Sequence, residues 1–505
     1  MDGFGLAQPA SDNAVLLADM KYFNSLINKF PSFSLAAAGL MVGLPWGKAG
    51  NSEVGHSAIG TGRVIVQEWA RINSDITTGD FFKNKAFLDA IGHCKKHNSK
   101  LHFIGLASPG GIHSHEEHLF ALLRLAEEKS VPQIFVHLIT DGEDVPQSEC
   151  LESLKRLQPF LKKSGARIAT IAGRAFSMDR VLNWNMTEKS WKAMAEGKGS
   201  AITDPSGYLS DSHKKNIGDE NIEPAVVVDQ KNIPVGLIAE DDALIFFNFR
   251  NDRMKQLVSS FAKKPKNLFI ATMTRYGYDI PVNAVAYEPP VIHKTLGKIF
   301  TDRHLRQLRI AEKEKEAHVS NFFNGGRIDP YEGEKHIIVP SKKVENQSLA
   351  KFPEMSANDI VKTVQKAMDE NYALHVINFA NADMIEHTGD LKASVAAVKV
   401  LDKSLEQIIE PILKKPDWLA VVTCDHGNAE QLQDPLTRER ETQHSTANVP
   451  AVFIGNGLEL KEPSKKTLEN LADDEQAGGL IDIAPSILKL MGIEKPSEMT
   501  GTSLI

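Results

Sequence analysis

The chain has 505 residues, of which 42% are hydrophobic and 24% charged, and its formal net charge at pH 7 is -7. This length exceeds what one compact core holds and predicts two or three globular domains, and the acidic balance argues against nucleic acid or an anionic membrane as a partner. Three cysteines suit a reducing cytosol, and no apolar run reaches the length of a membrane span, so we expect a cytoplasmic enzyme.

Near the N-terminus, the hexapeptide "NSEVGH" places Ser52, Glu53 and His56 in a glycine-laced segment. Asn51 and Ser52 are residue types that begin helices, because their side-chain oxygens accept hydrogen bonds from unpaired backbone N–H groups. From this stretch alone, Ser52 is a nucleophile, a metal ligand or part of a helix cap. All three readings stay open at this point.

Short apolar runs alternate with amphipathic helices along the rest of the chain. The helical pattern covers residues 116–129, 148–163 and 358–371. Nearly continuous apolar runs predict strands covered on both faces, and their alternation with helices predicts parallel sheets of the α/β class. Ligands of such sheets bind at the carboxyl ends of the strands. The runs end in polar residues there: "KLHFIGLASPGG", "QIFVHLITDGED", "ARIATIAGR", "ALIFFNFRND", "HVINFANAD" and "WLAVVTCDHGN".

The loop "SPGGIHSHEEH" contributes His113, His115 and His118. Neither cysteines nor a carboxylate cluster flank them at the usual zinc spacing, so a metal is disfavoured. Hydrogen bonding to a polar substrate is the better interpretation of this loop.

Two later segments are basic and follow predicted strands. "AGRAFSMDR" holds Arg174 and Arg180, and "FFNFRNDR" holds Arg250 and Arg253. Guanidinium groups bind phosphate and carboxylate through paired N–H donors. Most arginines are solvated or paired with surface acids, and that alternative stays open for these four.

Carboxylate–histidine pairs mark the C-terminal part of the chain. "NADMIEHTG" places Asp383 and His387 on one side of a helical turn, "TCDHGNAE" places Asp425 and His426 after a strand, and "TQHSTANVP" adds His444. Mixed oxygen and nitrogen donors suit Mn²⁺, Zn²⁺ or Fe²⁺, so the set predicts a two-metal site. Two metals beside an arginine pocket indicate phosphoryl transfer, with Ser52 as a metal-activated nucleophile.

Ten motifs taken together resemble, in order, those of the cofactor-independent (2,3-bisphosphoglycerate-independent) phosphoglycerate mutases of the alkaline phosphatase superfamily. The match runs from Asp2 to Ile505 and includes "DGFG", "GNSEVGHSAIGTGR", "GGIHSH", "DGEDVP", "EKEAHVSNFFNGG" and "DIAPSILKLMGIEKPSEMTGTSLI". The resemblance implies a two-domain α/β fold, an alkaline-phosphatase-like doubly wound sheet with an inserted α/β phosphotransferase domain. It places the metal-binding phosphatase-like domain at residues 1–67 and 300–505, and the inserted domain at 68–299.

The resemblance also implies two divalent metal ions, usually Mn²⁺, and no 2,3-bisphosphoglycerate. Ser52 would take the phosphoryl group of 3-phosphoglycerate and return it to the 2-hydroxyl of glycerate. The first ion would be held by Asp2, Ser52, Asp425 and His426. The second would be held by Asp383, His387 and His444.

For the substrate, the resemblance implies two groups of residues in a monomeric enzyme. Closure of the inserted domain over the substrate would exclude water. Asp144 would move protons between the hydroxyls of glycerate. Glycerate would be held by His113, Asp144, Arg174 and Arg180. The phosphate would be held by Arg250, Arg253 and Lys315.

The sequence departs from the family pattern around these residues. Glu143 in "DGEDVP" stands where the family has an arginine that contacts the substrate. This charge reversal should weaken substrate binding unless a nearby cation compensates for it or Glu143 turns away, and replacing Glu143 by arginine should lower KM for 3-phosphoglycerate. Pro109, Glu316 and Glu386 also replace the residues usual in the family. Glu386 lies between two expected ligands and would perturb the metal site or add a carboxylate to it.

The family has a hydrophobic strand before "DGFG", so we expect the natural start of this chain to lie further upstream. Two alternatives to the mutase stay open, a metal-dependent phosphomonoesterase of the same superfamily and a degenerate, non-catalytic metal-binding homologue. Retention of all seven expected ligands disfavours the second. Cys424, next to Asp425 in a predicted strand, should point into apolar packing.

Overall fold

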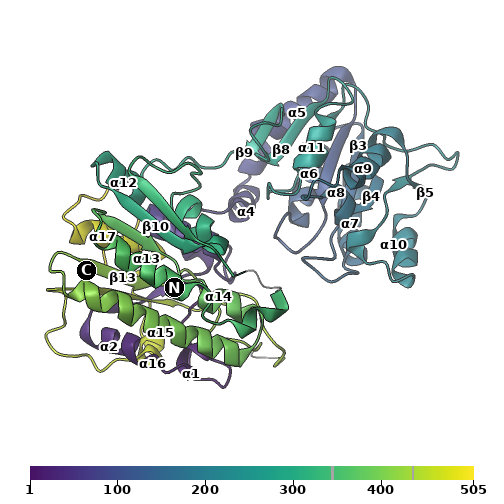
Figure 1. Ribbon diagram of the computed structural model, residues 1–505. Coiled ribbons are helices and arrows are strands. Elements are labelled where there is room, and N and C mark those ends of the chain that lie inside the picture. Colours follow the sequence, from purple (N-terminus) through teal and green to yellow (C-terminus); the bar gives the residue numbers. More distant parts are fainter. Residues whose placement is uncertain (343–345, 435–436) are drawn as a thin grey trace. The chain divides into compact units, whose positions relative to one another are not determined.

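The computed structural model describes residues 1–342, 346–434 and 437–505. It divides into two compact units, unit 1 (Met1–Gln67 with Val291–Ile505) and unit 2 (Glu68–Pro290), whose elements are labelled in Figure 1. The second boundary falls at Pro290, whereas the sequence expectation placed it at residue 299. None of the helices within the described ranges is both long enough and apolar enough to cross a bilayer.

The described residues of unit 1 form two sheets. The three-stranded sheet has the order β11-β10-β12, all parallel, and the four-stranded sheet has the order β13-β14-β1-β15. The strands are β1 (Ser32–Ala36), β10 (Gln307–Glu312), β11 (Glu334–Val339), β12 (Leu374–Ile377), β13 (Leu419–Thr423), β14 (Val449–Gly455) and β15 (Gly478–Gly479).

One strand direction in unit 1 differs from the expected parallel arrangement. β14 runs antiparallel to both β13 and β1, with Val452 opposite Val422 and Ser32. Parallel neighbours need a crossover connection, usually a helix, whereas an antiparallel strand can return through a loop alone. The segment from Cys424 to Asn448 contains no helix among its described residues, so β14 returns in the opposite direction.

Helices cover both faces of the unit 1 sheets. On one face α2, α13 and α15 bury Phe23, Val361 and Leu405 against strand residues such as Ile310 and Val422; Figure 1 shows α13 and α15 lying side by side. On the other face α12 and α17 pack against β12. The helices of unit 1 are α1 (Ala14–Leu17), α2 (Lys21–Lys29), α3 (Ser52–Thr61), α12 (Leu296–Asp302), α13 (Ala357–Ala367), α14 (Asn381–Glu386), α15 (Leu391–Leu413), α16 (Leu468–Asp473) and α17 (Ile483–Leu490).

An apolar cavity of about 480 Å³ lies between the two sheets of unit 1. It is lined by β12, the edge of the three-stranded sheet, and by β13, the edge of the four-stranded sheet, together with Met1. The N-terminal amino group of Met1 donates a hydrogen bond to the carbonyl oxygen of Thr423 at 2.8 Å. Asp2 is thereby held beside the end of β13.

Unit 2 is built on one eight-stranded sheet with the order β5-β6-β4-β3-β2-β7-β8-β9. Its strands pair in parallel apart from the antiparallel contact of β4 with β6. They are β2 (Leu101–Leu106), β3 (Ile134–Thr140), β4 (Arg167–Gly173), β5 (Ser200–Ile202), β6 (Ala225–Val227), β7 (Ala243–Phe246), β8 (Phe269–Thr274) and β9 (Ala284–Tyr287).

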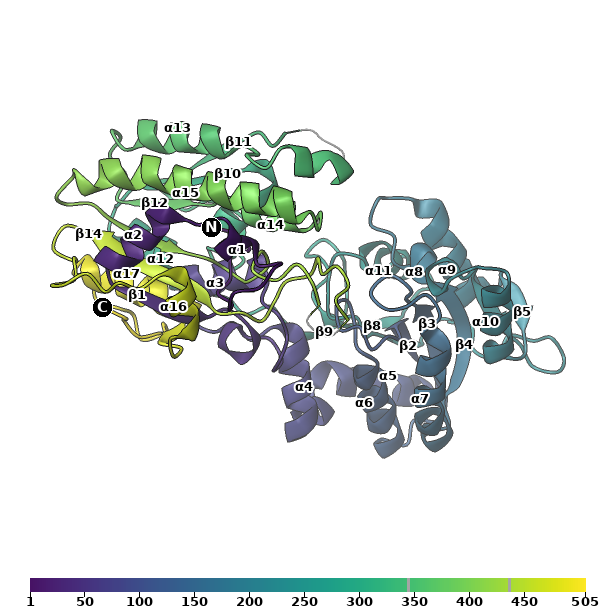
Figure 2. The ribbon, with the colours of Figure 1, turned by 90° about the horizontal axis from the view of Figure 1, so that it is seen from below.

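Two apolar layers flank the unit 2 sheet. In Figure 2, α5, α6 and α7 lie on one face and α8, α9 and α11 on the other. Successive residues of β2 point to opposite faces of the sheet. Phe103 packs in the layer of α5, α6 and α7, and Ile104 packs in the layer of α9 and α11. The helices are α4 (Glu68–Thr78), α5 (Lys85–His97), α6 (Glu116–Glu128), α7 (Cys150–Ser164), α8 (Arg174–Ser177), α9 (Trp184–Glu196), α10 (Pro205–Lys214) and α11 (Lys255–Phe261).

Single helical turns complete both units. In unit 1 a π-helical turn, η5, covers His318–Phe322. The 3₁₀ turns are η1 (Gly39–Val42), η2 (Asp80–Lys83), η3 (Asp219–Asn221), η4 (Lys313–Lys315), η6 (Asn346–Lys351) and η7 (Leu480–Asp482).

Candidate active site

Ser52 is the first residue of α3, and the preceding residue caps that helix. The side chain of Asn51 accepts a hydrogen bond from the N–H of Val54 at 3.1 Å. A Cβ on Gly55 would lie 2.3 Å from the carbonyl oxygen of Asp425, so glycine allows α3 to pack directly on the metal-ligand loop. Because Asn51 supplies the cap, Ser52 Oγ faces His426 Nε2 at 3.0 Å.

The expected metal ligands of unit 1 come together around Ser52 from segments far apart in the sequence. Asp2 lies beside the end of β13, Asp383 lies in α14 after β12, and Asp425 follows β13. Their side chains are at most 3% exposed. The carboxyl ends of β12 and β13 therefore bring these carboxylates together, as expected for α/β sheets.

Three histidines of this cluster share one orientation. His387 Nδ1 lies 2.8 Å from the carbonyl oxygen of Thr442, and His444 Nδ1 lies 3.0 Å from that of Gly50. His426 Nδ1 lies 3.2 Å from the carbonyl oxygen of Gly427. A ring nitrogen that faces a carbonyl oxygen carries a proton, so Nε2 is in each ring the nitrogen directed into the cluster. Metal-binding histidines are oriented in this way, and Nε2 gives up any proton it carries when the metal binds.

Lys315 joins the carboxylates at the centre of the cluster. Its Nζ donates to Asp2 Oδ1 at 2.7 Å and to Asp383 Oδ2 at 2.6 Å, and it lies 3.5 Å from Ser52 Oγ. Asp383 Oδ1 also lies 3.3 Å from Nε2 of both His387 and His444. The cluster thus places a carboxylate, an imidazole and an ammonium group around Ser52 Oγ.

The charges of these buried groups depend on one another. Burial lowers the pKa of Lys315, but Asp2 and Asp383 more than offset it, so the pKa lies above its ordinary value. Burial raises the pKa of Asp2 and of Asp383, yet Lys315 and the neighbouring histidines hold both well below the usual range. Burial also lowers the pKa of His426, whereas Asp425, Asp2 and Asp383 raise it to about 10. The carboxylates are therefore ionised and attract cations.

The donor set fits divalent metal ions. Ligand-type atoms lie within 4.8 Å of one another in the groups Asp383–His387–His444, Asp2–Asp383–His426 and Asp2–His56–Asp425. Asp425 Oδ2 is buried and accepts no hydrogen bond from the described residues. His56 Nδ1, at 3.2 Å from that oxygen, instead faces the carbonyl oxygen of Ser52 at 2.9 Å. Carboxylate oxygens and imidazole nitrogens suit Mn²⁺, Zn²⁺ or Fe²⁺.

A second cluster of expected site residues lies in unit 2 and centres on Arg174. This side chain, 1% exposed, begins α8 directly after β4. Its Nη1 donates to Asp141 Oδ1 at 2.5 Å and lies 2.8 Å from Asp144 Oδ2. Asp141 in turn accepts the backbone N–H of Asp144 at 3.0 Å, which shapes the loop after β3.

Glu143 connects two of the expected substrate-binding arginines. Its Oε2 lies 3.1 Å from Arg174 Nε, and its Oε1 accepts a hydrogen bond from Arg253 Nη2 at 3.0 Å. The nearby cations that would compensate for the charge reversal are therefore present. They are the side chains of Arg174 and Arg253, for which the family resemblance implies binding of the substrate.

His113 and Asp252 form the other half of the unit 2 cluster. His113 Nδ1 lies 3.4 Å from Asp252 Oδ1, and its Nε2 lies 3.9 Å from Asp144 Oδ2. Arg250 and Arg180 approach Asp252 at 3.3 and 3.6 Å. Burial raises the pKa of Asp252, but His113 and Arg250 bring it down to about 2.

The two units divide the expected site residues between them. Lys315, expected to hold phosphate with Arg250 and Arg253, lies in unit 1, whereas both arginines lie in unit 2. His115 caps α6 and stacks on Trp69, and His118 is buried against Asn73, so the structure joins neither to the His113 cluster. Glu316 pairs with Lys313, and Pro109 is half-buried.

Three residues beside the metal-ligand cluster of unit 1 were missed by sequence reasoning, although quoted motifs contain them. Asn378 Nδ2 donates to Asp2 Oδ2 at 2.6 Å, and Asn428 Nδ2 donates to Asp383 Oδ1 at 3.0 Å. Glu430 accepts the N–H groups of Gly5 and Asn428. The available signal was their place in the polar segments that follow β12 and β13.

Comparisons with known proteins agree on one family. The family described as "BPG-independent PGAM N-terminus (iPGM_N)" matches residues 72–278. The 2,3-bisphosphoglycerate-independent phosphoglycerate mutase 1 of Methanosarcina barkeri is 40% identical over 520 residues, covering 100% of this chain and 97% of the relative. The 2,3-bisphosphoglycerate-independent phosphoglycerate mutase of Clostridium acetobutylicum is 40% identical over 514 residues, covering 100% and 98%. A solved structure of Leishmania mexicana phosphoglycerate mutase at low cobalt concentration matches with a TM-score of 0.72 and 28% identity, covering 99% of this chain and 96% of that one.

Proposed function

The chain belongs to the 2,3-bisphosphoglycerate-independent phosphoglycerate mutase family, and from that premise we propose that it interconverts 3-phosphoglycerate and 2-phosphoglycerate through a phosphoserine on Ser52. The observation that carries the proposal is the surroundings of Ser52 Oγ. It lies 3.0 Å from His426 Nε2, 3.4 Å from Asp2 Oδ1 and 3.5 Å from Lys315 Nζ. It also lies at the N-terminus of α3, the end of a helix that favours a phosphate group.

Two divalent ions belong to this proposal, with Mn²⁺ as the metal. One would be held by Asp2, Ser52, Asp425 and His426, and the other by Asp383, His387 and His444. When bound, they would favour the alkoxide of Ser52 and balance the charge of the phosphoryl group. The Nδ1 contacts of the three histidines support these roles, because they direct each Nε2 into the cluster.

The residues of the chain then carry the transfer in two displacements. Ser52 Oγ forms a bond to phosphorus while the bond between phosphorus and O3 of glycerate breaks. In the second displacement, O2 of glycerate forms a bond to the same phosphorus and releases Ser52. We assign Asp144 the transfer of a proton from the 2-hydroxyl to O3, and Lys315 the stabilisation of charge on the phosphoryl oxygens.

The remaining roles are divided between the units. We assign unit 1 the phosphatase-like metal domain and unit 2 the phosphotransferase domain, with His113, Arg174 and Arg180 holding glycerate. Arg250 and Arg253 hold the phosphate. Because hydrolysis of the phosphoserine would yield a phosphatase, retention of glycerate in a water-excluding site is what makes the enzyme a mutase. We also propose that the protein is a monomer and that it acts in glycolysis in the cytoplasm.

The test uses purified full-length protein with Mn²⁺ and 3-phosphoglycerate, and follows 2-phosphoglycerate through enolase. We expect turnover without added 2,3-bisphosphoglycerate, and we expect EDTA and Ser52→Ala to abolish it. Ser57→Ala, on the same helix, is the matched control and should retain activity. Release of inorganic phosphate in place of 2-phosphoglycerate would favour the phosphomonoesterase, and neither product would favour the non-catalytic homologue.

A further inference from the structure

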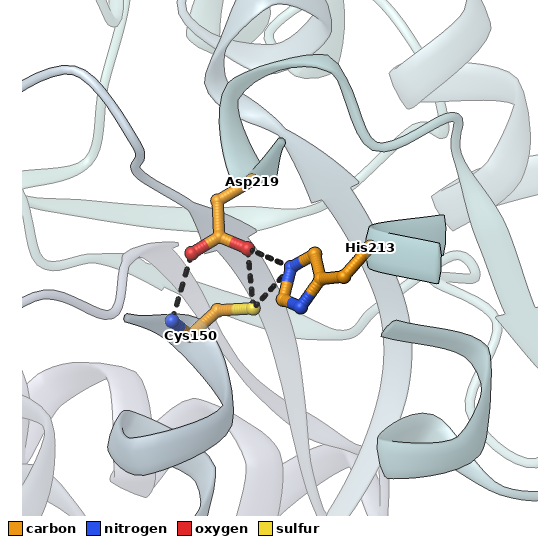
Figure 3. A group of neighbouring side chains, drawn as sticks. All are labelled: Cys150, His213 and Asp219. Atoms are coloured by element: carbon orange, nitrogen blue, oxygen red, sulfur yellow. Dashed lines mark hydrogen bonds and ion pairs between the residues drawn. The ribbon is translucent and has the colours of Figure 1, made fainter. Parts of the chain in front are cut away.

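Three metal-ligating side chains converge in unit 2 at a place that the proposed mechanism does not use. Cys150 is the first residue of α7, His213 lies in the last turn of α10, and Asp219 begins η3 (Figure 3). Cys150 Sγ donates to Asp219 Oδ1 at 2.6 Å, and His213 Nε2 lies 2.7 Å from the same oxygen. Cys150 Sγ and His213 Nε2 are 3.9 Å apart.

The carboxylate of Asp219 is fixed in its orientation. Its Oδ2 accepts the backbone N–H of Cys150 at 2.8 Å, so Oδ1 is the oxygen directed at the sulfur and the imidazole, as Figure 3 shows. Its backbone is also anchored, because its N–H donates to the carbonyl oxygen of Gln147 and its carbonyl oxygen accepts from Thr140 Oγ1 at 2.6 Å. Hydrogen bonds of this kind orient the ligands of metal sites in proteins.

Of the three side chains, only that of His213 is partly exposed to solvent. Asp219 is fully buried and Cys150 nearly so, whereas the His213 side chain is 18% exposed. A thiolate, an imidazole and a carboxylate are the three donor types that Zn²⁺ takes in proteins, and sites with three protein ligands keep a fourth position for water. The ligand atoms of this group lie within 4.8 Å of one another.

We propose that Cys150, His213 and Asp219 form a zinc site separate from the candidate active site. On binding, the sulfur loses its proton and becomes a thiolate, and His213 carries its proton on Nδ1 while Nε2 binds the ion. Without metal, the thiol keeps its proton and donates a hydrogen bond to Asp219 Oδ1. Burial and the Asp219 carboxylate raise the pKa of the Cys150 thiol, which agrees with that resting state.

The residue after Asp219 packs against two segments that carry expected substrate residues, the loop after β3 and the end of β4. A Cβ on Gly142 would lie 2.8 Å from the backbone N of Glu220, and one on Gly173 would lie 2.1 Å from its carbonyl oxygen. The turn after Asp219 therefore packs on the loop of Asp141 and Asp144 and on the residue before Arg174. A bound metal should slow hydrogen exchange of the backbone amides in both segments.

Cobalt gives the sharpest test, because a thiolate bound to Co²⁺ produces a charge-transfer band in the near ultraviolet that oxygen and nitrogen donors do not. Among the described residues, the metal-capable groups of the candidate active site consist of oxygen and nitrogen donors, which give no such band. We expect the band when Co²⁺ is added to the full-length protein, and we expect Zn²⁺ to remove it by competition. Cys150→Ser should abolish it, and His213→Gln should weaken Co²⁺ binding at least tenfold.

Cys94→Ser and Cys424→Ser are the matched controls, since both remove buried cysteines outside the proposed site, and both should retain the band. Circular dichroism verifies that each variant is folded, and His213→Gln keeps the test usable if Cys150→Ser does not fold. Absence of the band in the wild-type protein, or its persistence in folded Cys150→Ser, would overturn the proposal. Mutase activity of Cys150→Ser with Mn²⁺ should match that of the wild type.

Discussion

Glu143 is paired with Arg174, with 3.1 Å between Oε2 and Nε, although the family pattern has an arginine where Glu143 stands. The same carboxylate accepts a hydrogen bond from Arg253, so one acidic side chain engages two cations assigned to the substrate. Glu143 is therefore the counter-ion of both arginines, and we expect an anionic substrate to compete with it for them.

Removing that counter-ion should improve substrate binding. We expect Glu143→Gln to lower KM for 3-phosphoglycerate by about two- to fivefold, because partly exposed ion pairs contribute about 0.2–1 kcal/mol. Steady-state kinetics at low salt measures the effect. Glu152→Gln, which removes an exposed, ion-paired acid on α7, is the control and should leave KM unchanged. A higher KM for Glu143→Gln would show that Glu143 positions the arginines and does not compete for them.

The same pairing changes the expectation for the arginine substitution. Glu143→Arg restores the residue of the family but places a third guanidinium beside Arg174 and Arg253. At low salt we therefore expect Glu143→Arg to lower KM less than Glu143→Gln does. As added salt screens the repulsion among the guanidinium groups, the KM of Glu143→Arg should approach that of Glu143→Gln. A KM below that of Glu143→Gln at every salt concentration would mean that the arginine binds the substrate directly.

Gly55 should be needed for activity because it brings α3 against Asp425. Alanine favours a helix by about 1 kcal/mol over glycine, but a Cβ at Gly55 would lie 2.3 Å from the Asp425 carbonyl oxygen, and that overlap dominates. We expect Gly55→Ala to lower kcat/KM by about a hundredfold through displacement of Ser52 from the metal ligands. Gly92→Ala, in α5 with nothing within 4 Å of the added Cβ, should retain full activity. Equal activity of the two variants would contradict this geometry.

The metal content of the protein should depend on the histidines of unit 1. After dialysis against Mn²⁺, we expect two ions per chain by elemental analysis, and fewer than two for His387→Gln because its Nε2 faces Asp383. His97→Gln replaces an exposed histidine of α5 and should retain both ions. An unchanged metal content in His387→Gln would remove His387 from the ligand set.

The stability of unit 2 should fall at mildly acidic pH. Burial lowers the pKa of His118 to about 3 from its ordinary value of 6.5, so the folded protein disfavours the proton that the unfolded chain accepts. The contribution of neutral His118 to the free energy of unfolding is fully present above pH 6.5. It is lost as the pH falls toward 3, by about 1.4 kcal/mol per pH unit. Urea unfolding at several pH values should give a shallower dependence for His118→Gln than for His97→Gln. Equal slopes would contradict the buried, neutral state of His118.

Much of the fold follows from local patterns. Apolar periodicity located α6, α7 and α13, although α7 begins at Cys150 and α13 ends at Ala367, short of the expected Asn371. The apolar runs before "DGED" and "CDHGN" are β3 and β13, and Cys424 lies in the apolar core as expected. These features depend on neighbours in the sequence, so the sequence alone could predict them.

Features that depend on distant partners could not be predicted in this way. The antiparallel direction of β14 depends on the connection that precedes it, and the contact between Glu143 and Arg174 joins the ends of two different strands. Cys150, His213 and Asp219 form no motif in the sequence, because separate elements bring them together. Glu386 is fully buried, and burial raises its pKa to about 8, which its position between two expected ligands did not indicate.

The central claim is that Ser52 carries the phosphoryl group. Mn²⁺-loaded protein should be mixed with 3-phosphoglycerate and quenched with acid during a single turnover, and the peptide containing Ser52 should then be analysed by mass spectrometry. The account predicts a phosphate ester on Ser52 that forms and decays as 2-phosphoglycerate appears, is absent in Ser52→Ala and is retained in Ser57→Ala. Appearance of 2-phosphoglycerate while Ser52 stays unmodified at every time point would contradict it.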